Sequence, residues 1–228
     1  MDNRKDKNGK TPKPRRKRRT RNQAFQQAMM VAAPVAKAMV GSMRGPRTRS
    51  TPNGVIVENS ESVAALVSNT TANAESVGVT ELSVRTGSLP WLQQLGSLYA
   101  KYRFKSLKIT YEPYCPTSVG GQVIFALVYD ENDSNAVDIT VARLLQTFRN
   151  ARTAVWSSCA PVAYDPKRAA IPWYVSKPNP AASTLANLSV PCWLVFAYFS
   201  PAVSTPLGRF MAHYVVELIE PIAPGLNG

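Results

Sequence analysis

Two carboxylates stand three residues apart where an apolar stretch of the chain ends. The stretch "QVIFALVYD" (122–130) ends in Asp130, and the polar residues after it include Asp133. Hard cations such as calcium take several carboxylate and amide oxygens in flexible geometry, which the exit of a strand can present. The pair lacks the further ligands and the glycine of an EF-hand loop, so its spacing alone favours a solvated polar loop over a metal site.

The chain contains one histidine, His213, within the strand-like pattern "FMAHYVV". The sequence has no GxSxG nucleophile motif and no dinucleotide-binding, Walker, HExxH or zinc-finger spacing. We therefore predict that His213 is a half-buried strand residue rather than a catalytic base, and that the protein is not an enzyme.

The third chemical feature is a dense basic segment at the N-terminus. Disordered Lys and Arg side chains bind phosphates by charge and counterion release but have no fixed geometry toward base edges, so we expect RNA binding with low sequence specificity. The stretch "PRRKRR" also fits a nuclear localisation patch, and the two uses are compatible. The predicted RNA-binding residues are Arg4, Lys5, Lys7, Lys10, Lys13, Arg15, Arg16, Lys17, Arg18, Arg19 and Arg21.

The placement of charge separates this segment from the rest of the chain. The formal net charge is +13, and residues 1–50 hold 15 Lys and Arg against two Asp, whereas residues 51–228 hold 12 charges of each sign. An excess confined to one end suits a polyanion held by a flexible arm better than a folded basic groove. Nucleic acid is the partner that this distribution indicates.

Cysteine usage and hydropathy limit the remaining classes. Cys115, Cys159 and Cys192 form no CxxC pair and are too few for a disulfide framework, so we expect reduced, buried thiols in a cytosolic protein. The apolar stretch 29–43 is broken by Pro34 and Lys37 and is shorter than the roughly 20 residues of a membrane helix, so we expect no membrane partner. A secretory signal or a transit peptide fits this dense basic leader less well.

The body that must position these groups shows short β-type runs separated by Pro, Gly, Asn and Asp. Leu107, Ile109 and Tyr111 alternate onto one face of "KSLKITYEPY", whereas 122–130 is apolar throughout and should be buried on both faces. About seven or eight strands are expected, in the ranges 55–71, 105–114, 122–130, 154–164, 169–176, 190–200 and 208–221.

Two helices are expected between these strands. The first, 88–102, has Ser88 as its cap, Pro90 in its first turn and an apolar stripe that includes Leu92 and Leu98; the second, 138–150, has Asp138 as its cap. Because helices do not alternate with strands, we predict an all-β antiparallel sandwich or jelly roll with two short helices. The division is a disordered basic arm and linker at 1–54 and a folded domain at 55–228.

The segments "WLQQLGSLYAKYRF", "KSLKITYEPYCPTSVGGQV" and "VIFALVYDENDSNA" resemble the shell domain of coat proteins of small icosahedral plant RNA viruses, the sobemovirus and tombusvirus-like group. The resemblance covers about residues 60–222. It implies an eight-stranded jelly roll, an arm that faces encapsidated positive-strand RNA, and self-assembly into a T=3 shell in the virion, formed in the host cytoplasm. The chain stops after the last strand, so no protruding second domain is expected.

The same resemblance implies calcium between subunits, held by an Asp-x-x-Asp pair at this strand exit and an Asn near the C-terminus. Asp130 and Asp133 match the pair and Asn227 matches the terminal position. The family's arm often has a proline-rich stretch that orders around a symmetry axis, and only Pro46 and Pro52 stand in that region here. An ordered ring of arms is therefore doubtful.

Two alternatives from other classes remain at this point. The first is a cellular RNA-binding β-domain protein with a basic tail that forms no particles. The second is a secreted, lectin-like sandwich. Particle size separates the first from a capsid protein, and sugar binding tests the second.

Overall fold

The computed structural model describes residues 45–130, 140–146, 149–176 and 186–222. The N-terminal basic residues Arg4 to Arg21, and with them the predicted arm, lie outside these residues. So do Asp133, Asp138 and Asn227.

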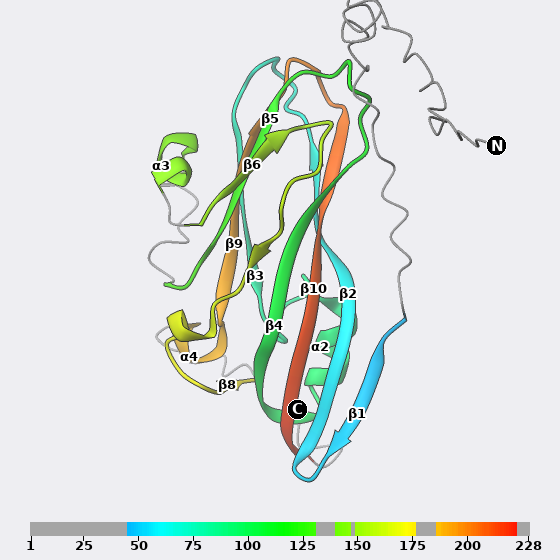
Figure 1. Cartoon of the computed structure of the whole chain (residues 1–228), viewed down its shortest axis with the longest axis vertical. Helices are drawn as coiled ribbons and strands as arrows, with labels where there is room; N and C mark the ends of the chain where they lie inside the picture. The colour runs from blue at the N-terminus through cyan, green and yellow to red at the C-terminus, as the bar shows by residue number, and fades with distance from the viewer. Residues whose placement is uncertain (1–44, 131–139, 147–148, 177–185, 223–228) are drawn as a thin grey trace, which may run out of the picture. The chain divides into compact units, whose positions relative to one another are not determined.

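Ten strands of the described residues form two antiparallel sheets (Figure 1). The six-stranded sheet has the order β1-β2-β10-β4-β7, with β8 also paired to β4, and the four-stranded sheet has the order β3-β9-β5-β6. The strands are β1 (Arg47–Thr51), β2 (Gly54–Val67), β3 (Ser76–Leu82), β4 (Tyr99–Pro113), β5 (Gln122–Val128), β6 (Ala151–Ala154), β7 (Val162–Ala163), β8 (Tyr174–Val175), β9 (Cys192–Phe199) and β10 (Pro206–Pro221).

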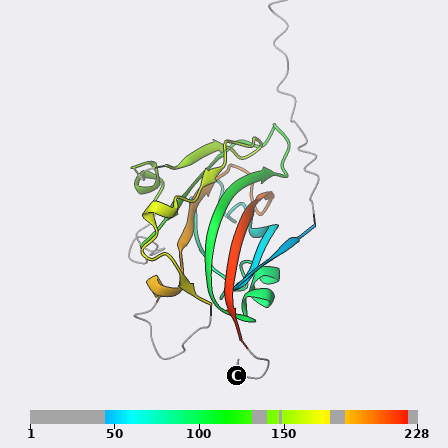
Figure 2. The same cartoon turned by 60° about the horizontal axis from the view of Figure 1, so that its bottom comes forward.

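The connections between the sheets confirm the predicted jelly roll. From β2 to β5 the chain changes sheet at every step, and it changes again between β6 and β7, β8 and β9, and β9 and β10. Without β1 and β8, each sheet keeps four strands, which gives the eight strands of a jelly roll. β4 and β10 run side by side in Figure 2, and α3 (Val141–Gln146) lies on the opposite side of the sandwich.

The main hydrophobic core lies between the two sheets and is rich in aromatic rings. Phe210 of β10 lies at its centre, with ring centroids 4.9 Å from Phe125, 5.0 Å from Phe196 and 5.7 Å from Tyr111. Leu107, Ile109 and Tyr111 are fully buried on this side, so the predicted inward face of β4 is confirmed.

Two strand predictions were wrong in detail. Range 154–164 is divided between β6 and β7, which lie in different sheets, and of 169–176 only Tyr174 and Val175 form a strand. β3 was not predicted, because Gly78 interrupts its β-type pattern. The structure requires that glycine, since a Cβ built there would lie 2.2 Å from Cζ of Phe196.

The predicted linker also contains structure. Residues 47–51 form β1, which pairs with β2 from Arg47↔Glu58 to Thr51↔Gly54. Pro52 and Asn53 therefore form the turn between two strands. Turns and linkers are rich in the same residues, so composition alone does not distinguish them. The division of the chain at residues 54 and 55 stays a prediction.

The first predicted helix is shorter than expected. α2 spans Pro90–Gly96, and the rest of the predicted range, from Tyr99, already belongs to β4, where Tyr99 pairs with Pro221 of β10. Ser88 does not cap it, since its hydroxyl donates to the Glu81 carbonyl oxygen. The carboxylate of Glu61 accepts the first-turn amides of Trp91 (2.8 Å) and Leu92 (3.2 Å) instead.

The second predicted helix, α3, packs on the four-stranded sheet. Leu144 is buried against this sheet, whereas its neighbour Leu145 is 43% exposed. A short α4 (Ala186–Ser189) and one 3₁₀ turn, η2 (Pro166–Arg168), complete the described helices.

Candidate functional site

The candidate cation site begins at the exit of β5. Ile124 and Ala126 face one side of this strand and Val123 and Phe125 the other, and all four are buried, as the uninterrupted apolar sequence predicts. Asp130, two residues after the strand, is exposed. A carboxylate at the surface end of a buried strand has the donor chemistry and access that a hard cation needs.

Tyr129 fixes the backbone that carries Asp130. Its ring stacks on Tyr164 with centroids 5.6 Å apart, and its hydroxyl oxygen accepts the Asp165 amide at 2.7 Å. The guanidinium of Arg168 lies 4.5 Å from the ring centroid. Burial raises the pKa of Tyr129, although the Asp165 amide acts against this. The ring is therefore a neutral anchor, and Asp130 follows directly from it.

Asp165 ties the same corner to the segment after α3. One carboxylate oxygen lies 3.3 Å from Nη1 of Arg149, and the other accepts the Lys167 amide at 3.1 Å. The carboxylate of Asp165 therefore stabilises this corner through the Arg149 ion pair and the Lys167 amide. Asp130 is the acidic residue of this corner that the sequence predicts as a ligand. The described residues contain no group of three or more His, Cys, Asp or Glu placed to hold a metal ion. The metal set of Asp130, Asp133 and Asn227 stays a prediction.

His213 lies on the outer face of the six-stranded sheet between two hydroxyl groups. Its Nδ1 is 2.8 Å from Ser60 Oγ and its Nε2 is 3.0 Å from Thr110 Oγ1. Burial lowers its pKa, Glu112 raises it and Lys108 lowers it further. A catalytic histidine is usually oriented by a carboxylate, whereas both ring nitrogens of His213 face hydroxyl groups. The prediction of a half-buried strand histidine is confirmed.

The same outer face has a ladder of ion pairs across β4 and β10. Glu217 lies 2.7 Å from Arg103 and 3.3 Å from Lys105, and Arg209 lies 2.8 Å from Glu112. Arg103 also lies over the Trp173 ring at 4.3 Å. The half-buried Trp173 therefore contacts a cation on this face.

The predicted thiols are free, as expected. Cys115 and Cys192 are buried and Cys159 is half-buried, and burial raises the pKa of each. Such thiols are poor nucleophiles. No helix among the described residues has the length and hydropathy needed to cross a membrane.

The sequence did not reveal the contacts that anchor the β5 exit. Tyr164, Asp165 and Arg168 stand about 35 or more residues after Tyr129, as the 36-residue separation of Tyr129 and Asp165 shows. Neither periodicity nor motif spacing links such distant positions.

Eight-stranded jelly rolls are found in viral capsid proteins, and comparison with known proteins agrees with this class. A family model described as viral coat protein (S domain) matches residues 28–224. The chain belongs to this family. It is a structural capsid protein of the virion, related to those of tombus-like and sobemo-like plant viruses, and is not an enzyme.

Individual relatives place it among plant virus coats. The capsid protein of tobacco necrosis virus (strain A) is 29% identical over 218 residues, which cover 86% of this chain and 77% of the relative. The structure of tobacco necrosis virus has a TM-score of 0.75 at 30% identity and covers 90% of this chain and 100% of its own. Cocksfoot mottle virus, at 17% identity and a TM-score of 0.56 over 74% of this chain and 96% of its own, shows the fold alone. The cellular and lectin-like alternatives are therefore wrong.

Proposed function

We propose that this capsid protein assembles into an icosahedral T=3 shell and packages single-stranded RNA through its basic N-terminal segment. The observation that carries the proposal is the partition of charge. Residues 1–50 account for the whole +13 excess, and the remaining residues are balanced. Enclosed RNA needs positive charge that can follow its phosphates. Subunits that pack side by side need contact surfaces that do not repel one another.

RNA binding by unassembled subunits tests the role of the arm. The logarithm of the association constant should fall linearly with the logarithm of salt concentration, with a slope of about 0.7 per phosphate neutralised. Deleting residues 1–22 should abolish this slope while the circular dichroism of the body stays unchanged. A variant with every Arg of this segment changed to Lys is the matched control and should keep the slope. An unchanged slope after the deletion would remove the arm from the mechanism.

We also propose calcium at contacts between subunits, with Asp130, Asp133 and Asn227 as ligands. Carboxylates that meet at such a contact repel one another without a cation, so calcium would act as a removable clamp. This is supported by the exposure of Asp130 and by its fixed backbone beside Tyr129.

The calcium proposal is tested on assembled particles. Chelation should lower the thermal stability of wild-type particles, and Asp130→Asn combined with Asp133→Asn should make that stability independent of calcium. Glu58→Gln, which removes an exposed carboxylate of β2, is the control and should leave the calcium response intact. Wild-type particles that ignore the chelator would disprove the clamp.

The stretch "PRRKRR" supports one further use, import into the host nucleus. Residues 11–21 fused to a fluorescent protein should accumulate in nuclei, and the same fusion with the basic residues changed to Gln should not.

A further inference from the structure

The two edges of the four-stranded sheet differ in their protection against other chains. β3 pairs with β9 along all seven of its residues, and its other side meets no strand among the described residues. Natural proteins blunt such edges with Lys, Pro, bulges or very short strands. β3 contains no Lys, Arg or Pro, its one charged residue is Glu81 near its end, and Val77 is 37% exposed. The Glu81 carbonyl oxygen near its end accepts the hydroxyls of Thr86 and Ser88, and the rest of this edge is open to a partner.

The other sheet edges are protected against pairing with a strand of another chain. β1 carries Arg47 and Arg49, both exposed, and β7 and β8 have two residues each. β6, the opposite edge of the four-stranded sheet, has four residues and includes the exposed Arg152. β3 is therefore the long, unprotected edge among those that the structure describes.

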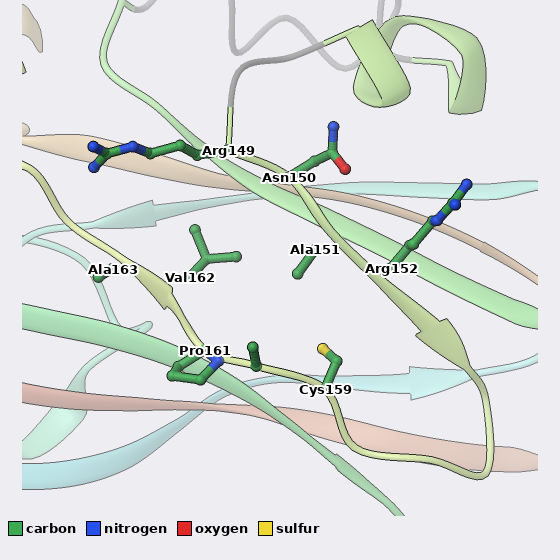
Figure 3. A pocket seen from close by; sticks show the side chains of 9 residues that line it. Arg149, Asn150, Ala151, Arg152, Cys159, Pro161, Val162 and Ala163 are labelled. Atoms are coloured by element: carbon green, nitrogen blue, oxygen red, sulfur yellow. The ribbon is translucent and has the colours of Figure 1, made fainter.

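A pocket lies beside the β6 edge. Its volume is about 400 Å³, and it opens between β6 and the segment that leads into β7. Cys159, Val162 and Ala151 contribute side chains to it in Figure 3, and Arg149 and Arg152 extend from its β6 side in opposite directions. The pocket thus has an apolar floor and a cationic rim.

The two edges have opposite charges. Glu75 and Glu81 are the only charged residues in 68–84, around β3, and Arg149 and Arg152 are the only ones in 149–163, around the pocket. Arg149 lies 3.3 Å from Asp165, so Arg152 is the better placed of the two for an outside partner. One sheet therefore ends in an acidic, apolar edge and in a basic edge with a hollow.

We propose that the β3 edge of one subunit docks against the β6 edge and pocket of the next. The occupant is a second copy of this chain, because the surface that complements each edge in charge is the other edge of the same sheet. A contact between two different surfaces of the same protein is head-to-tail. Such contacts form a closed ring when the rotation that relates neighbouring subunits returns to the first one. The proposal rests on the proposed function, since it assigns a lateral contact of the shell.

Charge reversal across this contact provides the test. Arg152→Glu would place a carboxylate opposite Glu75 and Glu81, and like charges across an interface strongly disfavour it. Particle yield, measured by sedimentation and electron microscopy, should fall about tenfold or more. The double variant Arg152→Glu with Glu75→Arg restores opposite charges and should recover most of the yield.

The controls separate this contact from folding and from the arm. Lys108→Glu makes the same charge change on an exposed position of the other sheet and should leave the yield unchanged. Arg152→Glu subunits should keep the wild-type circular dichroism and the wild-type salt slope for RNA. Wild-type yield in Arg152→Glu, or folded double variants that do not recover, would overturn the edge contact alone. Wild-type subunits that never form particles would instead reject the proposed function.

Discussion

The outer faces of the two sheets differ: that of the four-stranded sheet is covered by other segments of the chain, and that of the six-stranded sheet is open to solvent. On the four-stranded sheet, the outward side chains of β5 and β9 are apolar and buried beneath α3 and Val190. On the six-stranded sheet, the outward side chains of β4 and β10 include ion pairs and the half-buried His213. A sheet covered on both sides needs continuous apolar strands, whereas one covered on a single side needs alternation.

This difference assigns separate roles to the two faces. Covering by α3 makes the four-stranded face part of the interior, so its stability depends on packing. The six-stranded face depends on exposed charge pairs, which contribute little each and are screened by salt. Substitutions on the first face should therefore have large, salt-independent effects, and those on the second should have small effects that salt and pH change.

The same substitution type on the two faces gives the largest expected contrast. Ala197→Asp would bury a carboxylate beside Ile124, its partner on β5, and Val195, and should lower the free energy of unfolding by more than about 4 kcal/mol. Ser106→Asp, on the open face between Lys105 and Lys108, should change it by less than about 0.5 kcal/mol. Urea unfolding of subunits measures both. Similar losses for the two variants would show that the faces do not differ as described.

Adjacent leucines of α3 test the cover itself. Leu144→Ala should cost about 2–4 kcal/mol, because its side chain is buried on the four-stranded sheet. Leu145→Ala should cost less than about 0.5 kcal/mol, because its side chain is 43% exposed. Thermal unfolding of the two variants measures both costs, and because each variant replaces a leucine by alanine, the same atoms are removed in both. Equal costs would mean that α3 does not cover the sheet through Leu144.

The contrast between the faces also explains what the sequence could predict. β5 was located by its apolar run and the second half of β4 by alternation, because each pattern is a direct result of burial. β3 and β1 were missed because Gly78, Pro52 and Gly54 look like loop residues until their partners are known. The first helix was extended too far because Tyr99 to Tyr102 continue its apolar pattern, whereas pairing with β10 decides their structure.

The candidate site was predictable only in part for a similar reason. Asp130 is visible at the end of an apolar run, but Tyr164 and Arg168, which anchor the preceding tyrosine, lie on a distant loop. The charges at Glu75 and Arg152 suggest a contact between subunits only when the strand order is known, because that order places them at opposite edges of one sheet.

The ion pairs of the open face provide a smaller, salt-dependent effect. Burial alone would raise the pKa of Glu217, but hydrogen bonds from Arg103 and Lys105 lower it below its ordinary value of 4.5. A lowered folded-state pKa contributes stability above the unfolded-state pKa, and this is lost as pH falls through the folded-state pKa. Glu217→Gln should therefore cost about 1 kcal/mol at neutral pH and low salt, and less in 1 M salt. A cost that salt leaves unchanged would assign Glu217 to packing.

His213 should give the smallest change in stability. The fold favours the neutral form of this side chain, whereas it favours the charged form of Glu217. Burial holds its folded-state pKa below the ordinary value of 6.5, with Lys108 acting in the same direction and Glu112 against it. The unfolded chain therefore binds the proton first, so the free energy of unfolding should fall as pH drops through 6.5 and level off below the folded-state pKa. His213→Gln removes this titration, and the difference between the two stability curves, measured by urea unfolding from pH 7.5 to about pH 5, isolates it. The ring is only half-buried and keeps Ser60 and Thr110 beside it, so the loss should be smaller than that of Glu217→Gln. A wild-type protein that gains stability over this interval relative to His213→Gln would mean that Glu112 outweighs burial, and that this face favours the charged imidazole.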